Sequence, residues 1–354
     1  MHILITGGCG FVGSSIALYF KQKYPKYEIT ALDNLKRRGS ELNLVRLKNA
    51  GVLFVHADIR NAEDLQDVSA MDLIIDCSAD ASVLAGISTS RVQVINNNLM
   101  GTVNCLELAL KHQANFLFLS TSRVYPIANL EQASFEEQAT RFVWTNNQKV
   151  NGISEKGITE QFPLEGYRSL YGATKLASEL MIQEYHHLFG MPAIINRCGV
   201  LSGPWQMGKV DQGVTVLWIA RHFFQQNLSY IGYGGTGKQF RDILHVADLA
   251  LLLDKQIHLW EKGDGQLFNV GGGLTCGASL QELTIISEEL TGNAINIARV
   301  EENRAADIRI YYTDNTKVKE TYGWLPTKNM KDVCSDIFEW MKKNQELLKP
   351  ILAS

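Results

Sequence analysis

The sequence has no excess of charge of one sign and no long apolar run. Its 354 residues include 34 Lys+Arg and 37 Asp+Glu, so the formal net charge is −3. This balance argues against a nucleic-acid-binding protein that works through bulk positive charge. No apolar stretch approaches the roughly 18–20 residues that span a bilayer. The chain also does not begin with a basic segment followed by an apolar run, so we expect neither a membrane anchor nor a secretory signal.

The sequence also lacks close cysteine pairs and metal-ligand spacings. Its cysteines are scattered at positions 9, 77, 105, 198, 276 and 334, and its histidines show no metal-ligand spacing. Scattered thiols are typical of reduced cysteines, so we expect a cytoplasmic protein without disulfides and without a metal. What the sequence does have is 45% hydrophobic and 20% charged residues. This composition excludes global disorder, and the length predicts one large or two ordinary domains.

Short apolar runs alternate with helical patterns over the first two hundred residues. Strands are predicted at 2–6, 28–33, 52–56, 72–77, 115–120 and 192–198. Two amphipathic stretches, 90–112 and 169–189, each keep their apolar residues on one helical stripe. The stripes consist of Ile95, Leu99, Val103, Leu106 and Leu110, and of Leu170, Ala173, Ala177, Leu180 and Leu188. The alternation predicts an α/β fold with a Rossmann-type, doubly wound parallel sheet.

Two parts of the chain depart from this rhythm. Residues 126–167 are polar with few periodic apolar residues, which predicts a long loop or insertion. From about residue 200 the pattern loosens into glycine-rich turns and shorter elements. We therefore expect a smaller C-terminal lobe over 201–354.

A glycine motif follows the first predicted strand and precedes a helical pattern. Gly7, Gly10 and Gly13 are spaced three apart, and Asp33 ends the next strand 20 residues later. Such glycines let backbone N–H groups approach a pyrophosphate at a helix N-terminus, and a carboxylate at this place accepts bonds from ribose hydroxyls. The pattern predicts a dinucleotide site and favours NAD. The basic run 36–38 leaves NADP as an alternative, because those residues either bind a 2′-phosphate or are a solvated helix start.

A second group of residues predicts the chemistry. Tyr171 and Lys175 lie four apart at the start of a predicted helix and share one face. A neighbouring ammonium and a positive nicotinamide ring both favour a tyrosine phenolate, so the pair predicts a general base. Thr121 ends the strand 115–120, whose carboxyl end faces the same crevice. Its hydroxyl is placed to bond the reacting oxygen of a substrate.

Together these residues resemble the NAD-dependent sugar-nucleotide epimerase/dehydratase family of extended short-chain dehydrogenases/reductases. The glycine motif, the Thr121, Tyr171 and Lys175 triad, the run 98–102 (Asn-Leu-Met-Gly-Thr) and the run 267–272 (Leu-Phe-Asn-Val-Gly-Gly) all match family motifs. The resemblance implies a dinucleotide-binding domain at 1–200 with an insertion at 126–167. It implies a substrate-binding lobe at 201–354, with some chain crossing between the two. The cofactor contacts it implies are Gly7, Gly10, Phe11, Val12, Gly13, Asp33, Asn34, Asp58, Ile59, Ser78, Ala79, Asn98, Ser120, Tyr171 and Lys175.

The residues after Thr121 bear on the type of reaction. Family dehydratases carry an Asp-Glu pair there, and family decarboxylases tend to carry a Glu, whereas this chain has Ser122-Arg123. The resemblance therefore implies epimerisation without elimination. Segments at 136–142, 188–190, 211–213 and 237–245 are similar to the family's CDP-paratose/CDP-tyvelose 2-epimerase group, which implies a CDP-deoxysugar substrate. The substrate contacts implied are Arg123, Gln212, Arg241, Arg304 and Asp307.

Several alternatives remain open on the sequence. An NAD(P)-dependent sugar-nucleotide reductase or dehydrogenase shares these motifs, and a non-catalytic dinucleotide-sensing protein shares the fold. Asp58 either contacts the adenine or caps the next helix. Asp80 lies in a segment where relatives usually have Ala-Gly, and it either lies near the sugar or caps a helix. Val200 lies where many relatives have an Asn that holds the substrate. The helices 90–112 and 169–189 correspond to the family's usual interface helices, which implies a homodimer or homotetramer.

Overall fold

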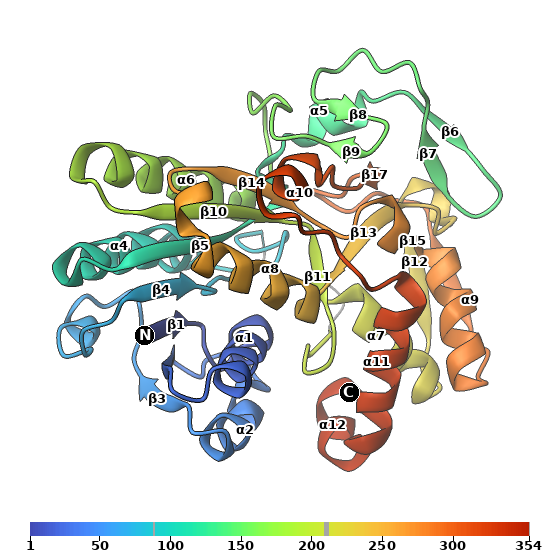
Figure 1. Ribbon diagram of the computed structural model, residues 1–354. Coiled ribbons are helices and arrows are strands. Elements are labelled where there is room, and N and C mark those ends of the chain that lie inside the picture. The colour runs from blue at the N-terminus through green and yellow to red at the C-terminus, as the bar shows by residue number, and fades with distance from the viewer. Residues whose placement is uncertain (88, 209–211, 354) are drawn as a thin grey trace.

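Seven parallel strands form the main sheet of the protein, whose computed structural model describes residues 1–87, 89–208 and 212–353 (Figure 1). The strand order is β14-β10-β5-β4-β1-β2-β3. In chain order the strands are β1 (His2–Thr6), β2 (Glu28–Asp33), β3 (Leu53–His56), β4 (Leu73–Asp76), β5 (Asn115–Thr121), β10 (Ala193–Cys198) and β14 (Leu267–Val270). The predicted doubly wound sheet and all six strands expected from the first two hundred residues are confirmed.

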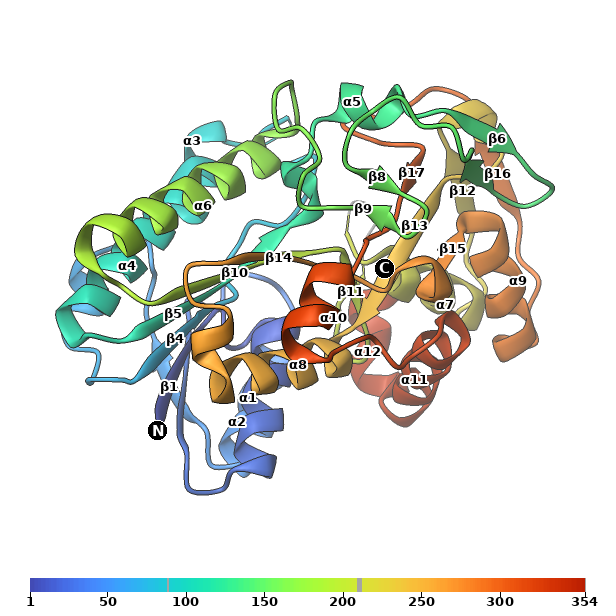
Figure 2. The ribbon, with the colours of Figure 1, turned by 45° about the horizontal axis from the view of Figure 1, so that its top comes forward.

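Helices cover both faces of this sheet (Figures 1 and 2). Successive strand residues point to opposite faces, so Ile3 and Ile5 enter one core and Leu4 the other. The first core also contains α1 (Phe11–Lys23), α2 (Asn43–Asn49), α8 (Val246–His258) and α10 (Thr316–Tyr322), and the second contains α4 (Gly101–His112) and α6 (Leu170–Phe189). Both α8 and β14 lie after residue 200, so the chain crosses back into the large sheet after entering the second lobe.

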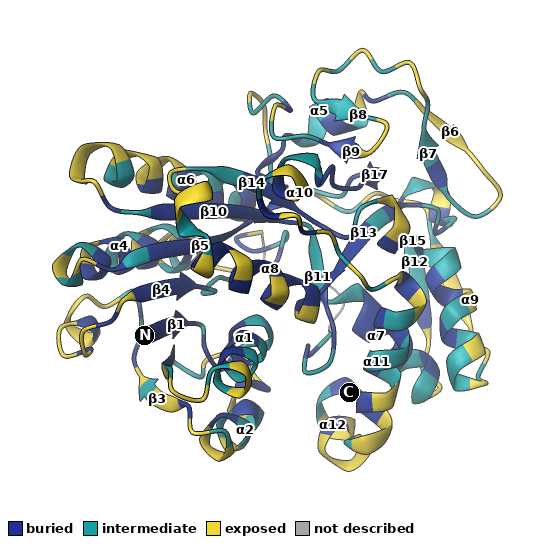
Figure 3. Cartoon of the chain, viewed as in Figure 1, coloured by how far each residue is buried: buried dark blue, intermediate teal, exposed yellow. Residues whose placement is uncertain are grey.

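The helix predicted over 169–189 is confirmed as α6, but its apolar stripe is not its buried face. Leu180 is 53% exposed and Leu188 is 63% exposed, on the outer side of the helix (Figure 3). The buried face instead carries Tyr171, Lys175 and Glu179. The first half of this inner face forms part of a polar site, and Ile182 further along it belongs to the second core.

The helix predicted over 90–112 is divided by a π-helical turn. It consists of α3 (Arg91–Ile95), the turn η3 (Asn96–Met100) and α4. The predicted stripe is again displaced, because Ile95 is 37% exposed while Val94 and Asn98 are fully buried. A π turn shifts the phase of the side chains that follow it and often marks a functional position.

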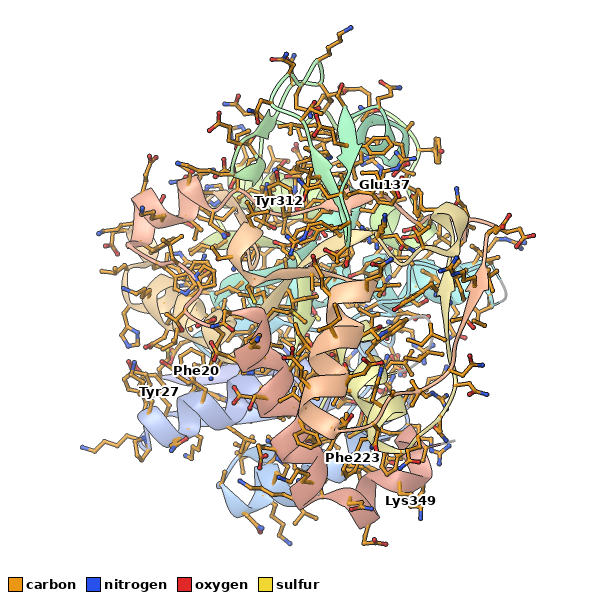
Figure 4. All side chains as sticks on the ribbon, turned by 90° about the vertical axis from the view of Figure 1, so that its right-hand side faces the viewer. Phe20, Tyr27, Glu137, Phe223, Tyr312 and Lys349 are labelled. Carbon is orange, nitrogen blue, oxygen red and sulfur yellow. The ribbon has the colours of Figure 1, made fainter. Side chains whose placement is uncertain are left out.

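The 126–167 insertion is ordered and is not a plain loop. It contains α5 (Ile127–Glu131), the hairpin of β6 (Phe135–Glu137) and β7 (Phe142–Trp144), and the hairpin of β8 (Ile153–Ser154) and β9 (Gly157–Ile158). The first hairpin packs on the second lobe, since the Trp144 and Tyr312 ring centroids lie 4.5 Å apart. Figure 4 labels Glu137 of this hairpin and Tyr312 of the second lobe.

The second lobe has its own small sheets and helices. Its strands are β11 (Val200–Ser202), β13 (Phe240–His245), β15 (Gly277–Ser279) and β17 (Ile310–Tyr311) in one sheet, with β12 (Leu228–Ile231) and β16 (Ile297–Val300) forming another. Its helices are α7 (Val214–Phe223), α9 (Leu280–Thr291), α11 (Met330–Lys343) and α12 (Gln345–Leu352). A third apolar core fills the space between α7, α9 and α11.

Candidate active site

A cavity of about 520 Å³, here called the central pocket, lies where the carboxyl ends of the main strands meet the second lobe. Its wall includes Phe11 and Val12 of the glycine loop, Thr121 at the end of β5, and Tyr171 of α6. Arg123, Arg241, Arg304, Asp307 and Gln212 also line it. The fold thus brings Thr121, Tyr171 and all five expected substrate residues to one pocket, whereas Lys175 is buried and does not line it.

The glycine loop fits a dinucleotide. A Cβ on Gly13 would lie 2.3 Å from the Gly7 carbonyl oxygen, so the close turn before α1 requires glycine there. Gly10 is the N-cap of α1 and has no side chain to accept from the first-turn N–H groups, which therefore face the loop as an anion site. Sequence reasoning missed Gly8, whose added Cβ would lie 2.6 Å from the Ala31 Cα. The signal that could have identified Gly8 is its position two residues after the end of the first predicted strand.

Asp33 at the end of β2 shapes this loop. Its Oδ2 accepts from the Cys9 N–H at 3.0 Å and its Oδ1 from the Leu35 N–H at 2.8 Å. Burial raises the pKa of this carboxyl, while those backbone bonds oppose the rise. Asp33 therefore joins the glycine loop to the second strand, at the edge where an adenosine ribose is expected.

The Asp58 carboxylate accepts hydrogen bonds from two neighbouring side chains. Its carboxylate accepts from Arg60 at 2.8 Å and from the Asn34 amide at 3.0 Å, and the Arg60 contact holds the Asp58 pKa below its usual range. The alternative that Asp58 caps the next helix is wrong, because that short helix, Glu63–Leu65, has Ala62 as its N-cap. Ile59 is buried under Gly101, where an added Cβ would lie 2.5 Å from its Cδ1.

The basic run after Asp33 contacts the second lobe. Arg37 donates to the Gln212 side chain at 2.5 Å and to the Met207 carbonyl at 3.3 Å, and Arg38 donates to the Pro350 carbonyl at 2.8 Å. Gln212, expected to contact substrate, therefore also joins the two lobes. These contacts show a role for the two arginines besides a 2′-phosphate site or a solvated helix start.

Tyr171 is placed by the first turn of α6. Ser169 caps this helix by accepting from the Gly172 N–H at 3.1 Å. A Cβ on Gly172 would lie 2.0 Å from the Arg123 carbonyl oxygen, so glycine lets α6 contact the turn after β5. Burial raises the pKa of Tyr171 to about 12, while a hydrogen bond with Thr121 and the Arg123 charge lower it. The sequence predicted this electrostatic role for Lys175 and the nicotinamide ring, and it placed Arg123 only as a substrate contact.

Lys175 lies one turn further along α6 and is 1% exposed. Its Nζ is 3.7 Å from the centroid of the Phe118 ring. Burial lowers the Lys175 pKa, and the carboxylates of Asp76 and Glu179 oppose this. Asp76 itself accepts from the Thr6 hydroxyl at 2.7 Å, which ties the lysine's surroundings to β1.

Asn98 in the π turn makes hydrogen bonds to the loop after β4 and to α6. Its Oδ1 accepts from the Asp80 N–H at 2.7 Å, and its Nδ2 donates to the Thr174 hydroxyl at 3.2 Å. Asp80 is close enough to raise the pKa of Tyr171. The alternative that Asp80 caps a helix is wrong, because the next helix, α3, is capped by Ser90. Ser78 and Ala79, expected at the cofactor, are half-buried in this same loop.

A buried ion pair lies under the catalytic face of α6. Arg197 of β10 donates to Glu179 through Nε and through Nη2, the latter at 2.7 Å, and to the Tyr125 hydroxyl at 3.2 Å. Tyr125 donates to Asn269 of β14 at 2.7 Å, and Ser120 donates to Glu179. This network joins α6 to β5, β10 and β14. Sequence reasoning missed Glu179, although it stands one helical turn after Lys175.

Two of the expected substrate residues, Arg241 and Asp307, contact each other. Arg241 donates to Asp307 at 2.8 Å. Arg123 donates to the Ala306 carbonyl at 3.3 Å, and burial, with the Arg241 charge, lowers its pKa to about 10. Val200 lines the pocket in place of an amide. Several cations thus face one cavity, which suits an anionic ligand.

Asp242 is a buried carboxyl beside the pocket. Its Oδ2 accepts from the Gly273 N–H at 3.1 Å and the Thr313 N–H at 3.0 Å. Its Oδ1 has no partner among the residues that the structure describes. Burial raises the pKa of Asp242 to about 6 from a usual 3.8.

We expect Asp242→Asn to remove a pH dependence of stability. Because the folded protein holds this proton more tightly than the unfolded chain, the contribution is present below about pH 4 and is lost as pH rises through about 6. A shift of this size corresponds to about 3 kcal/mol. Urea unfolding from pH 4 to pH 7.5 should show the free energy of unfolding of the natural protein falling by that amount relative to the variant. Parallel pH curves for the two proteins would contradict it.

No group of three or more His, Cys, Asp or Glu side chains within 1–87, 89–208 and 212–353 is arranged to hold a metal ion. Over the same residues, none of the helices is both long and apolar enough to cross a membrane.

Known proteins are similar to this chain in sequence and in fold. Residues 3–271 match the family described as "NAD dependent epimerase/dehydratase family". The chain is 30% identical to a CDP-paratose 2-epimerase from Salmonella typhi, over 96% of this chain and 99% of that protein. A dTDP-glucose 4,6-dehydratase from Bacillus anthracis, solved in complex with NAD, superposes with a TM-score of 0.74 at 25% identity over 99% of both chains. A UDP-glucose 4-epimerase from Thermotoga maritima, solved with UDP-glucose, gives a TM-score of 0.79 at 24% identity over 98% of this chain and 100% of that one.

Proposed function

The chain belongs to the NAD dependent epimerase/dehydratase family, and on that premise we propose that it inverts C2 of a CDP-linked deoxysugar of the CDP-paratose/CDP-tyvelose type. The observation that carries this proposal is the central pocket. It places Thr121 and Tyr171 in one cavity with Arg123, Arg241 and Arg304. A general base beside several arginines suits a nucleotide sugar, because the arginines can bind the diphosphate while the base acts on the sugar carbon.

The turn after β5 supports epimerisation over elimination. Arg123 occupies the place where a dehydratase carries an acid, and it lowers the pKa of Tyr171. A cation there stabilises a phenolate but has no proton to give at neutral pH. The 30% identical CDP-paratose 2-epimerase supports the choice of nucleotide and carbon.

Each residue of the site has its own role in such a reaction. NAD, when bound, supplies reversible hydride acceptance at the sugar carbon, so that no cofactor is consumed. Gly10, with the first turn of α1, and Asp33 would hold it. Tyr171 removes the proton of the sugar hydroxyl as the ketone forms and returns it after the ketone has turned over. Thr121 bonds the reacting oxygen, and the arginines hold the diphosphate.

The test is to incubate the purified protein with CDP-paratose or CDP-tyvelose, and with UDP-, GDP- and dTDP-sugars. We expect interconversion of the two CDP-sugars with no net NADH, and retention of a deuterium placed at C2. Stoichiometric NAD(P)H turnover would instead identify a reductase or dehydrogenase. Absence of turnover with every sugar nucleotide, despite bound NAD, would favour a dinucleotide-sensing protein.

We also propose that the chain forms a homodimer or homotetramer through α3 and α6, which pack side by side. Val92, Leu180 and Leu188 are each more than half exposed on these helices, where a partner copy would cover them. The variant with Leu180→Arg and Leu188→Arg is expected to be monomeric by light scattering. Leu347→Arg on α12 makes the same change at an exposed leucine elsewhere and should leave the mass unchanged. A natural protein that is already monomeric would contradict the proposal.

The cytoplasmic location expected from the sequence stays a prediction.

A further inference from the structure

A short segment of the second lobe, here called the 304–309 loop, carries two of the expected substrate residues. Arg304 and Asp307 of this loop both line the central pocket. The loop contains neither helix nor strand, and β17 begins directly after it. Ala306 within it has a φ of 61°, in the left-handed region that a residue with a Cβ rarely adopts. Such a conformation persists only when the surrounding structure fixes it, so the contacts of the loop with other elements decide where Arg304 and Asp307 lie.

Arg241 of β13 binds the middle of this loop. Its Nη2 donates to the Asp307 carboxylate at 2.8 Å and to the Ile308 carbonyl. Its Nη1 donates to the carbonyls of Phe240 at 2.7 Å and Arg309 at 3.1 Å. These bonds use all four N–H groups of the two terminal nitrogens. A diphosphate that binds to Arg241 therefore competes with the loop for the same donors, and the loop needs a second support that such a ligand does not reach.

Glu131, the last residue of α5, provides this second support from the insertion. Its Oε1 accepts from the Arg309 N–H at 2.5 Å and from the Tyr233 hydroxyl at 3.1 Å. Its Oε2 lies 3.0 Å from the Arg309 Nη1, and both side chains of this ion pair are less than a third exposed. Glu131 does not line the central pocket, so a ligand bound there leaves these contacts in place.

Tyr233 connects Glu131 to the other end of the same loop. The backbone N–H of Tyr233 donates to the Asn303 side chain at 2.7 Å, directly before Arg304. Burial and the nearby Glu131 charge raise the pKa of Tyr233, so its hydroxyl keeps its proton and donates to the carboxylate. One carboxylate thus fixes Arg309 directly and Asn303 through Tyr233, and these two residues stand at the two ends of the loop.

We infer that Glu131 is a positioning residue for the nucleotide sugar, because it fixes both ends of the 304–309 loop and so directs Arg304 and Asp307 into the central pocket. This inference rests on the proposed function and gives the insertion a role in it. Binding groups that are already fixed lose little freedom when a ligand arrives, so fixing them raises affinity. Tyr171 and the glycine loop lie outside this network, so Glu131 acts on substrate binding and not on the chemical step.

The test compares Glu131→Ala with Glu131→Gln in the purified holoenzyme. We expect Glu131→Ala to raise KM for the CDP-sugar about 10-fold and to change kcat by less than about 2-fold, the signature of lost binding alone. Glu131→Gln keeps an acceptor oxygen for the Arg309 N–H and the Tyr233 hydroxyl, so its KM should rise only about 3-fold. Calorimetric titration with CDP should show the same two factors in affinity.

Glu137→Gln is the matched control. Glu137 lies in the same insertion and pairs with Lys238 at 2.7 Å, but its side chain is 55% exposed. We expect KM, kcat and the affinity for CDP to stay unchanged in this variant. If Glu131→Ala does not fold, the smaller loss of CDP affinity in Glu131→Gln relative to this control still tests the inference.

A merely structural role for Glu131 would lower the free energy of unfolding and leave the affinity for CDP unchanged, which would overturn the inference. A fall in kcat as large as the fall in kcat/KM would also overturn it. Because calorimetry needs no turnover, a protein that does not epimerise CDP-sugars but binds CDP more weakly after Glu131→Ala refutes only the proposed function. An epimerase of CDP-sugars whose KM is unchanged by Glu131→Ala refutes only the inference, and a natural protein without affinity for CDP would contradict both.

Discussion

Tyr171→Phe is expected to lower the rate of CDP-sugar epimerisation by about 10²- to 10⁴-fold, the usual contribution of a positioned general base. The variant loses only the hydroxyl that exchanges a proton with the sugar. Its ring stays in the buried place that Gly172 and the Ser169 cap create for it. The cofactor contacts at the glycine loop are untouched, so NAD extracted from the purified variant should match that from the natural protein.

The measurement is the initial rate of epimer formation by chromatography or NMR, with bound NAD quantified in the same sample. Tyr167→Phe is the matched control, because that tyrosine lies nearby in the chain but is 67% exposed. We expect the control to retain its rate. A Tyr171→Phe protein with a near-normal rate would show that another group serves as the base.

Arg197→Met is expected to lower the free energy of unfolding by about 3–5 kcal/mol, the usual effect of breaking a buried ion pair. The Arg197 and Glu179 side chains are 4% and 1% exposed, and the guanidinium makes three contacts with the carboxylate. Removing the arginine leaves a buried negative charge with too few donors. The structure thereby also loses the bond from Arg197 to Tyr125.

Urea unfolding measures this change, and a double variant separates its causes. Adding Glu179→Leu to Arg197→Met removes the unpaired charge, so at least half of the lost stability should return. Lys342→Met breaks the exposed pair with Glu339 and should change stability by less than about 1 kcal/mol. A loss in Arg197→Met no larger than in that control would show that the buried pair contributes little.

Much of the architecture was readable from local patterns. The alternation of short apolar runs with helices predicted the parallel sheet, and the glycine spacing after β1 located the start of α1. Tyr171 and Lys175 share a face because residues four apart in a helix always do. The insertion was harder to predict, since its short hairpins are stabilised by contacts with the second lobe, such as that of Trp144 with Tyr312, and not by their own periodicity.

Local residue spacing predicted the order of strands and helices along the chain, the dinucleotide loop and the residue types of the catalytic face, because these depend on patterns within a few residues. Contacts between distant segments show which face of α6 is buried and that Arg37 contacts Gln212. Periodicity shows that a helix has two faces, but the neighbours packed on each face determine which one is buried. Those neighbours are distant in the chain, so no local spacing encodes them.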